Sequence, residues 1–102
     1  MIFEKILKHD KYVFSLCDTL NARYDRIQTH VPLYSNKRRL VGEIDILAYK
    51  NGICDIYEVK CSHRISKAKR QLKKLRKLMS IRHRIVGKTF FFCGESGTLI
   101  SV

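Results

Sequence analysis

Two apolar segments joined by one tight turn constrain the fold of this chain more than any other feature of its sequence. Residues 40–49 and 53–59 are rich in β-branched and aliphatic side chains, and the segment Lys-Asn-Gly at residues 50–52 separates them. An Asn-Gly pair is typical of turns that join two antiparallel strands, because both residues tolerate a positive φ. The sequence therefore predicts an antiparallel hairpin in the middle of the chain.

A helix is predicted before this hairpin. Apolar residues recur over residues 2–24 at spacings that keep one face of a helix buried. The pair His9 and Asp10 could interrupt this helix, because Asp is a good N-cap and can restart a helical turn.

A strand is predicted between that helix and the hairpin. Over residues 26–34 the side chains alternate, with Ile27, Thr29 and Val31 on one side. The polar and basic residues 35–39 follow, and they predict a mobile loop.

A second helix and two more strands are predicted after the hairpin. Beyond Ser62, which is a suitable N-cap, apolar residues repeat at intervals of three and four positions. These residues are Ile65, Ala68, Leu72, Leu75 and Met79. Residues 89–93 and 98–102 predict two strands around a turn at residues 94–97.

The expected architecture is a single α/β domain that comprises residues 1–102. A chain of 102 residues fits one compact domain with a modest core. Apolar residues make up 45% of it and proline occurs once, which excludes a disordered or a repeat composition. The order helix, three strands, helix, two strands favours an α/β sandwich with a mixed sheet.

Positive charge dominates the sequence and favours an acidic polymer as partner. The chain has 21 Lys and Arg against nine Asp and Glu, a formal charge of +12. No acidic residue lies between Glu58 and Glu95, whereas twelve basic residues do. Nucleic acid would bind such a surface through its phosphates, while an anionic membrane and a solvated helix without a partner are the alternatives. The candidate phosphate contacts are Lys37, Arg38, Arg39, Arg64, Lys67, Arg70, Lys73, Lys74 and Lys77.

The cysteines and most histidines follow no metal-ligand motif. The four cysteines, which lack the paired spacing of zinc and iron–sulfur sites, are expected to be buried and reduced. They are Cys17, Cys54, Cys61 and Cys93. Three histidines are interpreted as surface or phosphate-contacting residues; they are His30, His63 and His83. No apolar run is long enough for a signal peptide or a membrane span, so we expect a protein without a membrane partner that acts inside a cell.

The hairpin carries the residues that point to chemistry. Asp45 lies in the first apolar strand, and Glu58 and Lys60 lie in the second, where strand alternation puts them on one face. Glu43 is expected on the same face as Asp45, at the rim of the site. A charged side chain in an apolar strand costs free energy unless it is paired or binds a metal, so these placements require a reason.

Phosphodiester hydrolysis would supply that reason. Oxygen atoms of Asp45 and Glu58, together with the backbone carbonyl of Val59, are suited to hold Mg²⁺ or Mn²⁺. Lys60 would orient or deprotonate the attacking water and offset charge on the phosphate. No small-molecule cofactor is expected.

The two strand motifs resemble those of the PD-(D/E)XK nuclease superfamily. Residues 42–45 (Gly-Glu-Ile-Asp) and 57–60 (Tyr-Glu-Val-Lys) are similar to its second and third motifs. The resemblance covers residues 41–78 and extends to Gln71, which is similar to a glutamine of the RecB-like and archaeal Holliday-junction-resolvase branches. In those branches this glutamine helps to place the site or the substrate, and here helical geometry puts it beside the apolar stripe.

Other positions match the superfamily less closely. Its members carry an acid on the first helix, for which Glu4 is the candidate and Asp10 the alternative. The aromatic residue that often follows the glutamine is Leu75 here, and Ile44 replaces the proline before Asp45.

The resemblance implies a restriction-endonuclease-like αβββαββ sandwich, with a central mixed sheet flanked by helices. It also implies an endonuclease that acts on structured or branched DNA as a homodimer. The alternative is a basic nucleic-acid-binding module that has the nuclease fold without useful catalysis.

Overall fold

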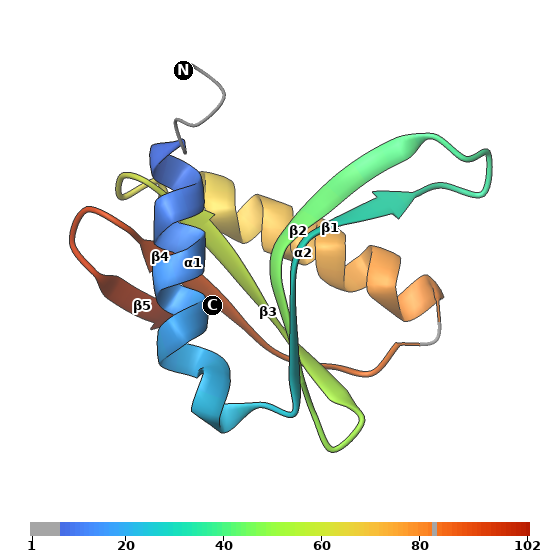
Figure 1. Ribbon diagram of the computed structural model, residues 1–102. Helices are drawn as coiled ribbons and strands as arrows, with labels where there is room; N and C mark the ends of the chain where they lie inside the picture. The colour runs from blue at the N-terminus through green and yellow to red at the C-terminus, as the bar shows by residue number, and fades with distance from the viewer. Residues whose placement is uncertain (1–6, 83) are drawn as a thin grey trace, which may run out of the picture.

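Two helices cover a five-stranded mixed sheet in the computed structural model, which describes residues 7–82 and 84–102 (Figure 1). The elements in chain order are α1 (Lys8–Leu20), the 3₁₀ helix η2 (Asn21–Arg23), β1 (Arg26–Tyr34), β2 (Leu40–Lys50), β3 (Ile53–Lys60), α2 (Ile65–Ile81), β4 (Val86–Cys93) and β5 (Thr98–Ser101). The strands lie side by side in the order of the sequence. Only the β3–β4 pair is parallel, because α2 crosses over between these two strands. The predicted α/β class and element order are confirmed.

The central hairpin is formed as the sequence predicts. Asn51 and Gly52 both have a positive φ, of 53° and 78°, which is the conformation of a two-residue hairpin turn. Strands β2 and β3 pair antiparallel from Lys50↔Ile53 to Ile46↔Tyr57. Toward its other end β2 bends away from β3, so the two strands form a fork (Figure 1).

Several element boundaries differ from the prediction. Helix α1 starts at Lys8 and runs through His9 and Asp10 without interruption, and the residues before position 7 lie outside the described part of the chain. Ser62 does not cap α2, because that helix begins after Arg64 and has no side-chain cap. Strand β4 begins three residues earlier than predicted, since its parallel pairing with β3 starts at Val86.

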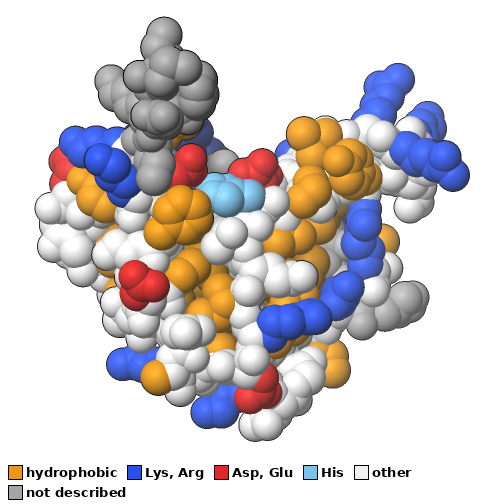
Figure 2. All heavy atoms as spheres, viewed as in Figure 1, with side chains coloured by type: hydrophobic (Ala, Val, Ile, Leu, Met, Phe, Trp, Pro, Cys, Tyr) orange, Lys and Arg blue, Asp and Glu red, His pale blue; other side chains and the backbone are white. Residues whose placement is uncertain are grey.

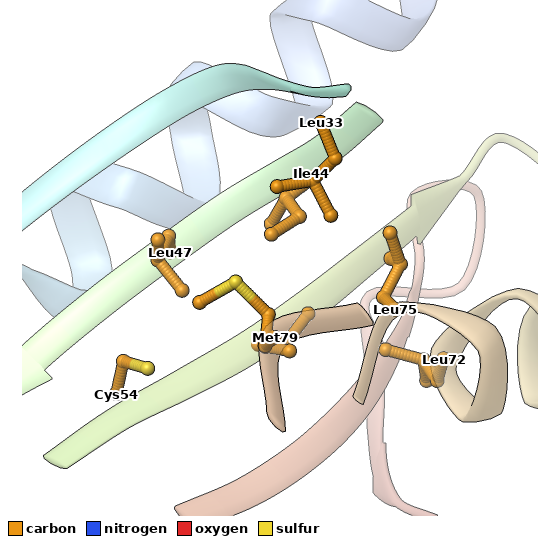
Figure 3. Close-up of a cluster of buried hydrophobic side chains, with 8 residues drawn as sticks. Leu33, Ile44, Leu47, Cys54, Leu72, Leu75 and Met79 are labelled. Carbon is orange, nitrogen blue, oxygen red and sulfur yellow. The ribbon is translucent and has the colours of Figure 1, made fainter. Parts of the chain in front are cut away.

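Each face of the sheet buries one helix. On one face Val13, Leu16 and Leu20 of α1 pack against β2 and β3. On the other face Leu72, Leu75 and Met79 of the predicted α2 stripe pack around Ile44 and Ile56 (Figure 3). The first two residues of the stripe, Ile65 and Ala68, pack near Phe91. The residues labelled in Figure 3 are Leu33, Ile44, Leu47, Cys54, Leu72, Leu75 and Met79.

The side-chain alternation of β1 breaks at His30. Ile27 packs in the α1-side cluster, whereas Val31 packs in the α2-side cluster, so the prediction that they share a face was wrong. The cause is the backbone of His30, whose φ of 52° lies in the left-handed region. The face changes on β2 as well, since Ile46, the partner of Thr29, belongs to the α1 side and Ile44, the partner of Val31, to the α2 side.

The segment between β1 and β2 is a closed turn. The backbone amide of Ser35 donates to the carbonyl of Arg39 at 2.8 Å, and the Ser35 hydroxyl accepts from the amides of Lys37 and Arg39. The predicted loop therefore has a defined hydrogen-bonded shape at the tip of a projecting arm (Figure 1).

All four cysteines are free, but only Cys54 and Cys93 are buried, whereas the prediction was that all would be. No helix in residues 7–82 or 84–102 is long and apolar enough to cross a membrane.

Replacing Gly94 with Ala is expected to destabilise the fold. The Gly94 backbone lies against the ring of Tyr12 on α1, so an added Cβ would overlap that ring. Overpacking of this kind costs about 1 to 3 kcal/mol. Chemical denaturation measures the loss. Glu95→Ala, in the same turn and exposed, is the control; equal stability of the two variants would contradict the close contact with α1.

Candidate functional site

Asp45 occupies the fork between β2 and β3. Its side chain is buried, with the residue only 7% exposed. The backbone amide of Val59 donates to Oδ2 of Asp45 at 2.9 Å, beyond the last β2–β3 pair at Ile46↔Tyr57. The carboxylate therefore accepts a hydrogen bond from a β3 amide at the point where the two strands separate.

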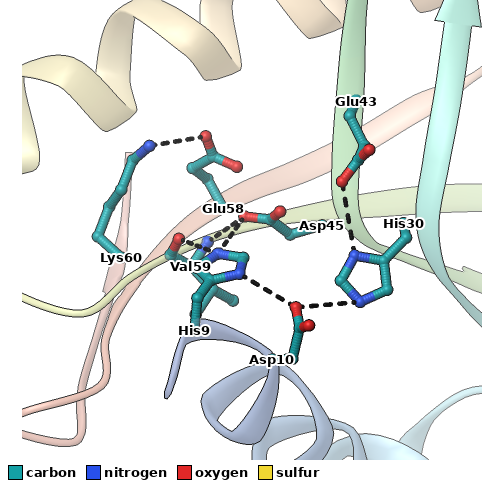
Figure 4. A network of polar contacts seen from close by, with 8 residues as sticks. All are labelled: His9, Asp10, His30, Glu43, Asp45, Glu58, Val59 and Lys60. Atoms are coloured by element: carbon teal, nitrogen blue, oxygen red, sulfur yellow. Dashed lines mark hydrogen bonds and ion pairs between the residues drawn. The ribbon is translucent and has the colours of Figure 1, made fainter. Parts of the chain in front are cut away.

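Glu58 and Lys60 lie beside Asp45 in this fork. Nζ of Lys60 is 3.5 Å from Oε2 of Glu58, as expected for residues two apart on one strand face (Figure 4). Glu58 is 2% exposed, and the Lys60 side chain is 17% exposed. The structure thus brings together the two acids and the amine that the sequence singled out.

The proximity of the two acids changes the chemistry of Glu58. Burial, a side-chain hydrogen bond with Asp45 and the charge of Asp45 raise the pKa of Glu58 to about 8, while Lys60 acts in the opposite direction. A second ionised carboxyl group this close to Asp45 is costly in a buried site, so Glu58 retains its proton to a higher pH or the pair requires a cation.

His9 on the first turn of α1 joins the site, although nothing in the residue pattern singled it out. Its Nε2 lies 2.9 Å from the carbonyl oxygen of Val59 and 3.4 Å from Oδ2 of Asp45. These two residues supply two of the three oxygen ligands expected from the sequence. An imidazole nitrogen directed at them could bind the same cation.

His30 also lies at the site, a position that its interpretation as a surface or phosphate-contacting residue did not include. One donor atom each of His30, Glu43 and Asp45 lie within 4.8 Å of one another, a group that could hold a metal ion. Nδ1 of His30 is 3.5 Å from Oε1 of Glu43, and Nε2 is 3.6 Å from Oδ1 of Asp10 (Figure 4).

The other two histidines of that interpretation differ from His30. His63 is exposed, in agreement with a surface position, and its ring forms a T-shaped pair with Phe91, with the centroids 5.5 Å apart. His83 lies outside the described residues.

Of the two candidates for the acid on the first helix, the structure describes only Asp10. Asp10 reaches the site through histidines, since Oδ1 is 3.5 Å from Nδ1 of His9 and 3.6 Å from Nε2 of His30. Glu4 lies outside the described residues.

Gln71 is directed between α2 and the start of β2. It lines a small hollow of about 60 Å³ with Gly42, Glu43, Lys74 and Leu75. Its Oε1 is buried and has no hydrogen-bond partner within residues 7–82 and 84–102. A buried acceptor without a partner costs about 1 to 3 kcal/mol, so this oxygen is suited to receive a donor in the site.

The predicted phosphate-binding residues lie on two elements of the fold. Three of them form the exposed tip of the β1–β2 arm, and Figure 2 shows basic side chains on this arm. They are Lys37, Arg38 and Arg39. The others lie on α2 or directly before it, and all of these are exposed as well.

The basic residues of α2 are distributed around the helix. Lys67 and Lys74 lie on the same side as Gln71, which we call the site-facing side, because the three residues are spaced four and three positions apart. The remaining exposed candidates in this region are Arg64, Arg70 and Lys77.

Lys73 is an exception within the predicted set. It lies on the opposite side of α2 with Lys69 and Arg76, where they line a groove of about 410 Å³ against β5. A phosphate backbone that follows the site-facing side would not reach Lys73, so we separate this residue from the other candidates.

No model of a known protein family matches the chain, and no curated protein matches it either.

Glu58→Gln is expected to stabilise the metal-free protein, and more at pH 8 than at pH 5. The pKa of the Glu58 carboxyl group is about 8 in the folded protein and 4.5 ordinarily. The folded protein therefore becomes less stable as the pH rises from 4.5 to 8, because the unfolded chain releases this proton more readily. At about 1.4 kcal/mol per pKa unit, the gain at pH 8 is on the order of 2 to 4 kcal/mol. Thermal unfolding in EDTA at both pH values measures it. Glu95→Gln is the exposed control, and the same gain at both pH values would contradict the raised pKa.

Proposed function

We propose that this chain is a metal-dependent nuclease of the PD-(D/E)XK type that hydrolyses phosphodiester bonds of DNA. The observation that carries the proposal is the buried pair Asp45 and Glu58 in a strand fork, with Lys60 3.5 Å from Glu58. An acid on one strand and Glu-x-Lys on the next is the arrangement that the resemblance to this superfamily predicts. The mixed sheet with one helix on each face is compatible with a restriction-endonuclease-like sandwich.

The donor atoms in the fork fit Mg²⁺ or Mn²⁺. Asp45, Glu58 and the carbonyl of Val59 supply oxygen ligands, which both ions accept. His9 adds a nitrogen directed at two of these oxygens. A divalent cation would also relieve the repulsion that raises the pKa of Glu58. When bound, such an ion supplies positive charge to the phosphate and eases the loss of a proton from water.

The side chains of the fork have distinct tasks in hydrolysis. The amide of Val59 fixes the Asp45 carboxylate, so this ligand needs little reorganisation when substrate binds. Lys60, the most exposed of the three strand residues, orients the attacking water and offsets charge that builds on the phosphate. Gln71 supplies a buried acceptor that can hold a group of the site or substrate in place.

Duplex or branched DNA is the substrate class that the surface favours. The exposed basic residues of α2 and of the β1–β2 arm provide contacts to the phosphate backbone, independent of base sequence. Figure 2 shows acidic and histidine side chains at the edge of the molecule from which the basic arm projects. The small size of the chain and the junction-resolvase resemblance favour branched DNA, cut by a homodimer.

Asp45→Ala is expected to abolish metal-dependent cleavage, and Lys60→Ala to reduce it severely, while DNA binding is retained. Loss of Lys60 should lower the rate on the order of 10²- to 10⁴-fold, the usual contribution of a positioned proton-transfer group. The assay uses labelled linear duplex, single-stranded and four-way-junction DNA with Mg²⁺, Mn²⁺ or EDTA.

Asp18→Ala and Lys88→Ala are the matched controls for this experiment, because both side chains are exposed and distant in sequence from the fork. Wild-type protein that binds every substrate and cleaves none would refute the nuclease, and would favour a basic binding module.

Substituting the site-facing lysines of α2 is expected to weaken DNA binding more than substituting those on the other side. Lys67→Ala with Lys74→Ala should lower the affinity for DNA and reduce the slope of log K against log salt by about 1 to 2. The reason is that binding through fewer phosphate contacts releases fewer counterions from the DNA. The control is Lys69→Ala with Lys73→Ala, which removes the same charge. Fluorescence anisotropy over a salt series measures both, and equal losses would show that total charge, not one side of α2, determines binding.

A further inference from the structure

A second set of metal-ligating side chains lies across Asp45 from Glu58 (Figure 4). We propose that His30, Glu43 and Asp45 form a cation site of their own, which prefers a transition-metal ion such as Mn²⁺ over Mg²⁺. Any role of this site in DNA hydrolysis rests on the proposed function, whereas its occupation by metal does not.

The three side chains converge because of strand pairing. Thr29↔Ile46 and Val31↔Ile44 are partners, so His30 on β1 lies opposite Asp45 on β2, and Glu43 precedes Asp45 by two residues. One donor atom from each residue lies within 4.8 Å of the others. Ligands of one ion with bonds of about 2.1 Å are separated by roughly 3 to 4 Å, so small side-chain movements would close the site.

The ring of His30 lies between two carboxylates. Nδ1 faces Glu43 at 3.5 Å, while Nε2 faces the carboxylate of Asp10 at 3.6 Å (Figure 4). A carboxylate at the second ring nitrogen is the usual partner of a metal-binding histidine, because it fixes the tautomer and the ring plane. Phe14 forms a T-shaped pair with the same ring, with the centroids 6.2 Å apart.

The backbone at His30 gives independent support. Its φ of 52° is unfavourable for a residue with a side chain and costs about 1 to 3 kcal/mol. Strain of this kind persists where the surroundings require it, and it often marks ligand sites. Here it accompanies the change of face that brings His30 to the edge of the fork.

The donor types indicate which ion is preferred. Mg²⁺ favours oxygen ligands, whereas the affinity of first-row transition metals for a site with an imidazole nitrogen and carboxylates rises from Mn²⁺ onward. The fork site has three oxygen donors with the nitrogen of His9 beside them, whereas the set around His30 has a ring nitrogen and only two carboxylates. Asp45 belongs to both sets, which couples them.

The test adds Mn²⁺ to the full chain in excess Mg²⁺ and detects the ligands of the bound Mn²⁺ by pulsed electron paramagnetic resonance. A nitrogen coupling to bound Mn²⁺ is expected in the wild type, lost in His30→Gln, and retained in His9→Gln and in the exposed control His63→Gln. A wild type without this coupling, a His30→Gln variant that keeps it, or a His9→Gln variant that alone loses it would overturn the proposal.

Two further variants keep His30 and thus separate loss of the site from loss of folding. Glu43→Gln and Asp10→Asn should each weaken Mn²⁺ binding at least about tenfold, the first as a ligand and the second as the partner that orients the ring. Glu95→Gln, an exposed carboxylate, should change nothing, and Mn²⁺ affinities equal to the wild type in both variants would contradict the site.

This experiment is independent of cleavage. If Mn²⁺ binds at His30 and no DNA is cut, the second site stands and the nuclease proposal fails. If cleavage requires Asp45 and Lys60 but Mn²⁺ never couples to His30, the nuclease proposal stands and the second site fails.

Discussion

The hydrogen bond from the amide of Val59 to the carboxylate of Asp45 connects β2 and β3 at the place where their pairing stops. Without it, the Val59 amide would lack this partner and the buried Asp45 carboxylate would lose a donor, and a hydrogen bond to a charged group contributes about 1.5 to 3 kcal/mol. Because Asp45 is fixed there, Glu58 must lie against a second carboxyl group. The raised pKa of Glu58 and the demand for a cation both follow from this one placement.

The fork also determines how the two helices contribute. Helix α1 packs on one face of the sheet and brings its first turn, with His9, to the oxygens of Asp45 and Val59. Helix α2 packs on the other face and brings Gln71 beside Glu43. The apolar stripes on the two helices therefore position polar residues that make no contribution to the core. Packing energy holds the helices, and the site uses the residues at their margins.

The sequence predicted the central hairpin and its acids because each signal there is local. The positive φ of Asn51 and Gly52 follows from residue type, and the convergence of Glu58 with Lys60 follows from strand alternation. His9 and His30 could not be found in this way. Their contacts depend on the angle at which α1 crosses the sheet and on a left-handed residue inside β1, and neither has a signature in the residue pattern.

The left-handed conformation of His30 makes the predicted side-chain alternation of β1 wrong, and it also places metal-ligating side chains close together. Strict alternation would have kept Ile27 and Val31 on one face, and it would have left His30 among the solvent-facing residues of β1. One left-handed residue instead lets β1 contribute to the cores on both faces, since Ile27 packs on the α1 side and Val31 on the α2 side. The polar residues at this change of face, His30 and Asp45, are then left at the fork between the two cores. The same irregularity that satisfies apolar packing on both sides thus gathers metal-ligating groups at the boundary.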